Sequence, residues 1–248
     1  MAEGPIIYKK KEQVALITLN RPEKRNALNT DIVTQLREAW VDFESDPDMR
    51  VAILTGNGKV FCAGIDLGDL QAGSIVSSCV PNVGVEITKP VIGAIQGPAI
   101  GVGLSLAMSC DIKVISKRAT FIFPEAKIGI SQGGVDLLRY VPYAIAMEIW
   151  LTGDPLEAKR AYELGMVNRV VPDGKLMSEA MKFADVLERN APLSLKMLKM
   201  LAVEHTLTVR SAWYLTEARY IRPQFESEDR KEGIQAFKEK RKPVFKGK

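Results

Sequence analysis

Residues 89–125, KPVIGAIQGPAIGVGLSLAMSCDIKVISKRATFIFPE, decide the fold of this chain. The stretch predicts a buried strand over 90–95, a glycine-rich turn over 97–103, a short apolar helix over 104–109, and two more strands over 111–115 and 120–123. A strand that enters glycines and then a helix leaves unpaired backbone N–H groups at the helix N-terminus, where the helix dipole favours negative charge. We therefore expect the turn to hold an anion, or an oxygen that becomes one during a reaction.

The sequence on both sides of this stretch alternates strands with helices, which is typical of an α/β domain. Upstream, Asn29 or Thr30 is placed to cap an amphipathic helix that breaks at Asp46-Pro47. Downstream of Glu125 the pattern becomes mainly helical and amphipathic. We predict a core over residues 1–190 and a helical C-terminal region over residues 191–248.

Composition excludes several classes of protein. The 248 residues are 46% apolar, which is enough for a sizeable core. No apolar run approaches the roughly 20 residues of a membrane span, and the N-terminus lacks the order of a signal peptide, so we expect a cytoplasmic protein. Cys62, Cys79 and Cys110 are odd in number and form no CxxC pair, which favours free thiols over disulfides or a metal site. The net charge of +4 is small, and we expect no nucleic-acid or membrane partner.

Two chemistries compete for the glycines of the central stretch. Gly97, Gly101 and Gly103 have the spacing of a dinucleotide-binding loop. Such a loop normally follows the first strand of its domain, whereas almost a hundred residues precede this one. No tyrosine of the chain is followed four residues later by a lysine, so the catalytic pair of the short-chain dehydrogenases is absent. The sequence therefore disfavours a dehydrogenase.

The second interpretation uses two glycine turns together. Residues 62–66 and 99–103 each follow a predicted strand and carry glycine. Two backbone N–H groups that converge from separate turns make an oxyanion hole, which stabilises the negative oxygen of a tetrahedral or enolate intermediate. This arrangement predicts chemistry on a carbonyl group.

At this point the sequence resembles the crotonase family, the enoyl-CoA hydratases and isomerases. The resemblance is carried, in the order usual for the family, by NRPEKRNAL, FCAGIDL, KPVIGAIQGPAIGVGLSLAMSCDI, the dipeptide PE, LTGD, AYELGMVNRVV and EDRKEGIQAFKEKRKPVFKG. It covers essentially the whole chain. It implies an α/β fold, a crotonase-like spiral of ββα units with a helical C-terminal trimerisation region. It also implies a homotrimer or a hexamer formed from two trimers.

The resemblance also implies an acyl-CoA thioester substrate whose carbonyl oxygen lies between the N–H groups of Ile65 and Val102. Family members commonly have glycine where this chain has Val102, so the turn must accept a β-branched residue. The two acids of the family's hydratases correspond to Ser105 and Glu125, and only Glu125 is an acid here. Because apolar residues surround Glu125 in the sequence, we expect burial to raise its pKa and suit it to acid/base catalysis. Ser105 could equally be a small residue bonded back within its helix.

Three other titratable residues have weaker claims. Asp136 follows the Gly133-Gly134 turn and could supply a replacement carboxylate, but a first-turn acid favoured by the helix dipole is the simpler interpretation. Asp66 is expected to cap its own turn. His205, the only histidine, lies far from every glycine turn in the sequence and is assigned no catalytic role.

The resemblance implies no cofactor other than the coenzyme A that is part of the substrate itself, and no metal is expected. By correspondence of motifs, the coenzyme A part would be bound by Lys24, Arg25, Ala63, Gly64, Ile65, Phe237 and Lys240, with the last two often donated by a neighbouring subunit. Lysine and arginine at these positions can neutralise phosphates. Each of them could instead be an ordinary solvated surface charge.

Three functions remain open from the sequence. The first is an enoyl-CoA hydratase or dehydratase, the second a 3-enoyl to 2-enoyl-CoA isomerase that uses Glu125 alone, and the third a catalytically impaired acyl-CoA-binding relative. Ser105 favours hydration, because a hydroxyl can bind water whereas an isomerase gains from an apolar residue there. The pair of Ser105 and Glu125 is similar to that of the hydroxycinnamoyl-CoA hydratase-lyases. We therefore expect water addition to an activated enoyl-CoA.

Overall fold

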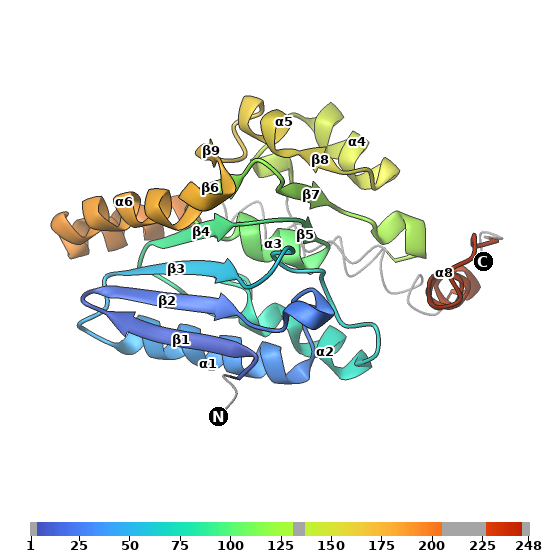
Figure 1. Cartoon of the computed structure of the whole chain (residues 1–248), viewed down its shortest axis with the longest axis horizontal. Helices are drawn as coiled ribbons and strands as arrows, with labels where there is room; N and C mark the ends of the chain where they lie inside the picture. Colours follow the sequence, from blue (N-terminus) through green and yellow to red (C-terminus); the bar gives the residue numbers. More distant parts are fainter. Residues whose placement is uncertain (1–3, 131–136, 205–226, 245–248) are drawn as a thin grey trace.

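The computed structural model describes residues 4–130, 137–204 and 227–244. Its main sheet has six strands in the order β1-β2-β3-β4-β6-β9 (Figure 1). The strands are β1 (Ile6–Lys11), β2 (Val14–Leu19), β3 (Val51–Gly56), β4 (Val91–Ile95), β6 (Ile112–Ser116) and β9 (Arg169–Val171). β1 and β2 form an antiparallel hairpin, and every later pair in this sheet is parallel. The carboxyl ends of the parallel strands therefore lie at one edge.

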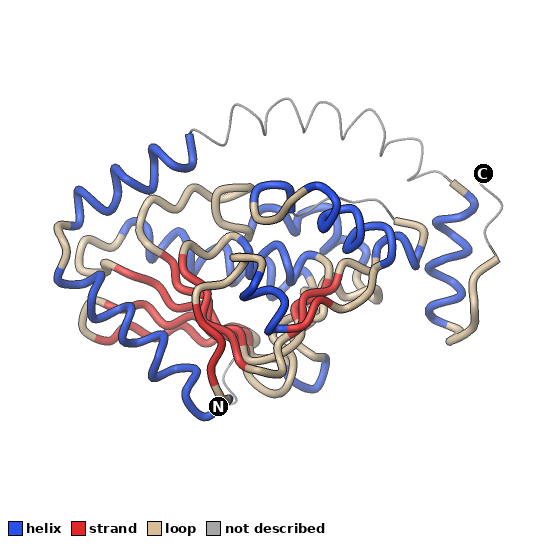
Figure 2. The backbone as a smooth tube through the Cα atoms, turned by 90° about the horizontal axis from the view of Figure 1, so that it is seen from above, coloured by secondary structure: helices blue, strands red, loops and turns tan. Residues whose placement is uncertain are grey.

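A second, smaller sheet lies beyond that edge, and Figure 2 shows its strands as a separate group. It consists of β5 (Ala99–Ile100), β7 (Thr120–Ile122) and β8 (Leu156–Glu157). β5 lies inside the predicted glycine turn, and β8 lies in a segment for which the sequence predicts no strand. Both strands have only two residues, which is too short for periodicity to reveal. A strand of each sheet followed by a helix makes the predicted ββα unit, as in β4, β5 and α3.

Helices cover both faces of the main sheet. The α-helices are α1 (Thr30–Ser45), α2 (Leu70–Ile75), α3 (Val102–Met108), α4 (Tyr143–Thr152), α5 (Ala158–Glu163), α6 (Leu176–Arg189) and α8 (Glu228–Lys238). Short 3-10 helices are η1 (Pro22–Lys24), η2 (Val76–Cys79), η3 (Glu125–Ile128), η4 (Leu137–Arg139) and η5 (Asp173–Lys175). Asn29 is the N-cap of α1, because its side chain accepts a hydrogen bond of 3.1 Å from the amide of Ile32.

The two faces of β3 show why its sequence reads as an unbroken apolar run. Leu54 packs into the core that includes Trp40 of α1, whereas Ile53 packs into a second core with Ala180 of α6. All four residues are fully buried. A parallel strand covered by helices on both sides must be apolar at successive positions.

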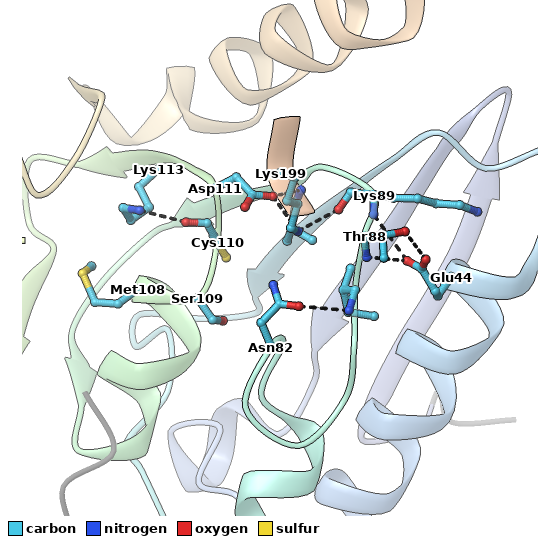
Figure 3. A network of polar contacts seen from close by, with 12 residues as sticks. Glu44, Asn82, Thr88, Lys89, Met108, Ser109, Cys110, Asp111, Lys113 and Lys199 are labelled. Carbon is cyan, nitrogen blue, oxygen red and sulfur yellow. Dashed lines mark hydrogen bonds and ion pairs between the residues drawn. The ribbon is translucent and has the colours of Figure 1, made fainter. Parts of the chain in front are cut away.

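The helix over residues 192–204 is attached to the main sheet at the opposite edge, by the amino ends of the strands (Figure 3). Residues 192–204 are helical, and the buried Lys199 of this helix donates to Asp111 Oδ2 and to the carbonyl of Lys89, each at 2.8 Å. Asp111 Oδ2 also accepts from the amide of Val91 at 2.7 Å. One ion pair therefore joins this helix to β4 and β6.

Other predictions about the chain's organisation are not settled by the fold. The division into domains at residue 190 stays a prediction. Asp136 and His205 lie outside the described residues. In the part of the chain that the structure covers, no helix combines the length and the hydropathy needed to cross a membrane.

Candidate active site

The two predicted glycine turns lie side by side at the carboxyl edge of the main sheet. Cys62 and Ala99 form a parallel bridge, in which the Ile100 amide donates to the Cys62 carbonyl at 2.9 Å. Gly64 has a φ of +88°, and a Cβ placed on it would lie 2.9 Å from the carbonyl oxygen of Ile100. A Cβ on Gly103 would overlap the Cys62 carbonyl. The turns approach this closely only because both positions are glycine.

The backbone around Ile65 leaves its N–H out of the bridge that holds this turn to Leu28. The Leu28 amide donates to the Gly64 carbonyl at 2.8 Å, and the Asp66 amide donates to the Leu28 carbonyl at 2.9 Å. In such a parallel bridge the middle residue, Ile65, turns its own N–H away from Leu28.

Val102 carries the second N–H group of the predicted pair. It is the first residue of α3, where a backbone N–H has no acceptor within the helix. A Cβ placed on Gly64 would lie 3.9 Å from this nitrogen. The structure therefore places the turn that contains Ile65 next to the N-terminus of α3, and the pairing of the Ile65 and Val102 N–H groups stays a prediction.

Val102 is tolerated because its neighbour carries the unusual backbone conformation. Gly101 has a φ of 55° and a ψ of −121°, whereas Val102 is helical. A β-branched side chain at a positive φ would be strained, but in this turn only glycine occupies such a position. The turn thus accepts valine where the family commonly has glycine.

Glu125 begins η3, directly after β7 and Pro124, and its carboxyl group faces the turn. A Cβ on Gly101 would lie only 2.8 Å from Glu125 Oε1. Oε2 is buried and has no hydrogen-bond partner among the described residues. Burial raises the pKa of this carboxyl to about 7, as expected from the apolar surroundings. A surface or helix-capping glutamate would show neither feature.

Ser105 lies one helical turn after Gly101, and its amide donates to the Gly101 carbonyl at 3.3 Å. Its side chain is buried, and its Oγ has no partner in the described part of the chain, so it is not bonded back to its helix. Helical side chains lean toward the N-terminal end of the helix, which here is the Gly101 end. Because buried polar atoms normally form hydrogen bonds, Ser105 Oγ and Glu125 Oε2 are available to a bound reactant.

Asp66 is occupied by structural contacts. Its Oδ1 accepts from the Gly68 amide at 3.0 Å, which confirms that it caps its own turn. Its Oδ2 forms an ion pair of 2.6 Å with Arg21, and that contact holds the pKa of Asp66 below its usual value. Arg21 was missed from the sequence, although it lies inside the NRPEKRNAL motif. This ion pair fastens the loop before α1 to the Ile65 turn.

The predicted coenzyme A residues fall into two groups. The Ala63 amide donates to the Arg25 carbonyl at 3.0 Å, so the exposed Lys24 and Arg25 lie beside the turn that contains Gly64 and Ile65. Phe237, which is 58% exposed, lies in the last turn of α8, and Lys240 follows the C-cap of that helix. Across the described residues, no hydrogen bond or ion pair joins Lys240 to the first group. The structure thus groups five of the seven residues.

The cysteine thiol groups and one cavity of the molecule have no part in the predicted site. Cys62, Cys79 and Cys110 are buried free thiols, as predicted, and burial raises the pKa of each to about 12. A cavity of about 500 Å³ lies between the loop over residues 82–88 and residues 199–204. That loop precedes β4, at the edge of the sheet opposite the glycine turns, and no predicted site residue lines the cavity.

Comparison with known proteins agrees with this geometry. A family model described as enoyl-CoA hydratase/isomerase matches residues 9–248. The chain belongs to this family. It is 36% identical to an enoyl-CoA hydratase, EchA19, of Mycobacterium tuberculosis, over 98% of this chain and 97% of that enzyme. It is also 36% identical to an (E)-benzylidenesuccinyl-CoA hydratase of Thauera aromatica, over 98% of this chain and 99% of that enzyme.

A solved structure also agrees with the fold of this crotonase. The crystal structure of a carnitinyl-CoA hydratase from Mycobacterium avium superposes with a TM-score of 0.87 at 34% identity, and the match covers 100% of both chains. The predicted crotonase fold is therefore confirmed. The protein is an enzyme of the hydratase class, in a family that acts on acyl-CoA thioesters.

Proposed function

We propose that this crotonase adds water reversibly to the double bond of a conjugated, activated enoyl-CoA, with Glu125 as its single acid/base. The proposal rests on two buried polar atoms that have no partner within the described chain, Glu125 Oε2 and Ser105 Oγ. The Glu125 carboxyl group lies against Gly101 through Oε1, and Ser105 lies one helical turn after Gly101. One is a carboxyl group with a pKa near neutrality, and the other is a hydroxyl that binds water but cannot act as a base near neutral pH.

One carboxylate is enough to complete the addition of water, because it takes a proton and later returns it. Ser105 Oγ holds the water, and the Glu125 carboxylate takes a proton from it as the water oxygen bonds to the β-carbon. The electrons of the double bond move onto the thioester oxygen and give an enolate. Glu125 then returns the proton to the α-carbon, the enolate collapses to the thioester, and the carboxylate is regenerated. Dehydration follows the same steps in reverse.

The N–H groups of Ile65 and Val102 stabilise the enolate oxygen in this mechanism. Loss of one oxyanion donor typically costs about 3 kcal/mol of transition-state stabilisation. Both donors belong to the backbone, so the side chains of Ile65 and Val102 are free to vary. The glycines that let the two turns touch are therefore more constrained than the donors themselves.

Activation of the substrate compensates for the missing second acid. An aromatic ring bonded to the β-carbon stabilises partial positive charge on that carbon while its bond to the water oxygen is incomplete, so less help from a second carboxylate is needed. The name of the 36% identical relative from Thauera aromatica describes hydration of a benzylidene thioester, which is conjugated with a ring. We expect slow turnover of crotonyl-CoA, which lacks such a group.

The coenzyme A part would bind along the loop and turn that adjoin the oxyanion pair. Lys24 and Arg25 are exposed cations next to Ala63 and Gly64, and can neutralise phosphates. Phe237 and Lys240 would complete the site from another copy of the chain, since both residues are solvent-exposed in one copy.

Isomerisation is the second candidate, because one carboxylate suffices to move a proton from one carbon to another. A panel of linear, branched, cyclic and aromatic enoyl-CoA thioesters, incubated in oxygen-labelled water, separates the candidates. Hydration predicts loss of enoyl absorbance and a product that carries the label. Interconversion of 3-enoyl and 2-enoyl thioesters without label would replace our proposal with the isomerase. Binding without turnover of any thioester would identify a catalytically impaired relative.

A further inference from the structure

The C-terminal helix α8 contacts η3, the segment that begins with Glu125, through glycine on both sides. A Cβ placed on Gly233 of α8 would overlap the carbonyl oxygen of Ile128. A Cβ placed on Gly129 would lie 2.6 Å from the carbonyl oxygen of Asp229. Figure 1 shows α8 at one end of the molecule, next to the segment that follows β7. The backbones of α8 and η3 are therefore in direct contact.

The side chains of α8 are arranged for this close approach. Its two buried residues are Gly233 and Ala236, whereas the large apolar Phe237 is 58% exposed. Glycine in the middle of a helix costs about 1 kcal/mol relative to alanine, so its presence needs a compensating contact. The contact of Gly233 with Ile128 is that compensation.

Two backbone hydrogen bonds connect the contact between α8 and η3 to Glu125. Gly129 ends η3 at a φ of +67°, and its amide donates to the Glu125 carbonyl. The Ile130 amide donates to the same carbonyl at 2.9 Å. A shift of residues 128–130 therefore moves the backbone of Glu125. On the other side, Glu125 Oε1 has little room, because it lies against Gly101.

We propose that Gly233 is a positioning residue: its closeness to Ile128 lets α8 hold η3, and so the Glu125 carboxyl group, at the correct distance from the Gly101 turn. This inference rests on the proposed role of Glu125. Any side chain at position 233 pushes α8 and η3 apart. The carboxyl group then leaves its buried setting beside the reactants.

Gly233→Ala tests this inference, because helix propensity and close packing predict different effects of the added methyl group on stability and catalysis. Propensity alone predicts a more stable α8 and unchanged catalysis. Positioning predicts a kcat at least about 10-fold lower with KM much less affected, since a misplacement of about 1 Å can cost about 100-fold. It also predicts that the midpoint of the pH–rate profile moves below its wild-type value, because Glu125 becomes less buried. The assay uses whichever of crotonyl-CoA and cinnamoyl-CoA the wild type turns over faster.

Two further variants keep the test decisive. Gly174→Ala is the matched control, because a Cβ there meets no atom within 4 Å and the backbone is not in the left-handed region. Ser227→Ala keeps every glycine but removes the N-cap that accepts from the Arg230 amide at 3.1 Å. Fraying of α8 should move kcat and the midpoint in the same direction by a smaller amount. Ser227→Ala decides the question if Gly233→Ala does not fold.

Unchanged kcat and midpoint in folded Gly233→Ala would overturn the inference. The same result in Ser227→Ala would overturn it if Gly233→Ala is unfolded. Glu125→Gln in the same assay keeps this failure apart from failure of the proposed function. If Glu125→Gln retains activity, the role of Glu125 is wrong. If Glu125→Gln is inactive while Gly233→Ala behaves as wild type, only the positioning by α8 is wrong.

Discussion

At the scale of single residues, the site depends on two polar side chains that lack a protein partner among the described residues. Glu125 Oε2 and Ser105 Oγ are both buried, in a protein whose other buried polar groups are mostly hydrogen-bonded. A buried unpaired polar atom costs about 1–3 kcal/mol of folding free energy. Such a cost is expected at catalytic sites, where the partner is the substrate.

Ser105→Ala tests the role of the hydroxyl. Because the alanine cannot hold the water, we expect hydration of cinnamoyl-CoA to fall by about 10-fold or more, in line with the loss of a hydrogen bond of about 1–2 kcal/mol. The unfolding free energy should rise by up to about 1–3 kcal/mol, since the substitution removes an unpaired buried hydroxyl and orphans no partner. Equal loss of hydration and of any isomerisation activity would remove water binding from the function of Ser105.

The protonation of Glu125 predicts how the rate depends on pH. Burial raises its pKa to about 7, and the mechanism starts from the carboxylate. The rate of hydration, measured as kcat/KM, should therefore rise with pH and reach half of its plateau near pH 7. A rate that is constant between pH 5 and 9 would mean that another group exchanges the proton.

The ionisation of Glu125 should lower the stability of the fold as the pH rises, whereas it raises the rate of hydration. A carboxyl whose pKa is raised by folding favours the folded state below the usual pKa of 4.5, and this contribution is lost as the pH rises to about 7. Replacement of Glu125 by glutamine should raise the unfolding free energy at pH 8 by at most about 3 kcal/mol. The difference should shrink as the pH falls to 4.5, as denaturant titrations at several pH values would reveal.

At the scale of elements, the site is made by two strand-to-helix turns and η3, and glycine decides how they meet. Gly101→Ala should reduce kcat by about 100-fold. The added Cβ would lie 2.8 Å from Glu125 Oε1, and alanine is strained at a φ of 55°. Gly73→Ala is the control, because its Cβ would meet no atom within 4 Å. Equal kcat values in the two variants would show that Gly101 does not limit the position of Glu125.

The elements also show how far the sequence predicts this structure. The long apolar runs of β3, β4 and β6 and the glycine turns were predictable because burial and turn geometry act locally. β5 and β8 were not, because two-residue strands exist only through pairing with β7. The contact between α8 and η3 was hidden for a similar reason. It joins segments about a hundred residues apart. A glycine within a helical pattern indicates a close contact, but it does not indicate which segment makes that contact.

At the scale of the whole molecule, the exposed apolar side chains predict assembly. On the helix over residues 192–204, Leu193, Leu198 and Leu201 are exposed by 69%, 65% and 68%. Large exposed apolar groups on one element are typical of an interface between subunits. We expect a homotrimer or a hexamer in light scattering. Leu201→Glu should shift it toward monomers, whereas Val41→Glu on α1 should not, and a wild-type monomer would contradict this prediction.

The most direct test of the account is the turnover of Glu125→Gln with the best thioester of the panel. Glutamine keeps the size of the side chain but cannot exchange a proton, so kcat should fall by at least about 1,000-fold. The unfolding free energy at pH 8 should be no lower than that of the wild type, which shows that the fold is intact. Activity within a few-fold of the wild type would contradict the account, because the proton transfer would then have to occur elsewhere.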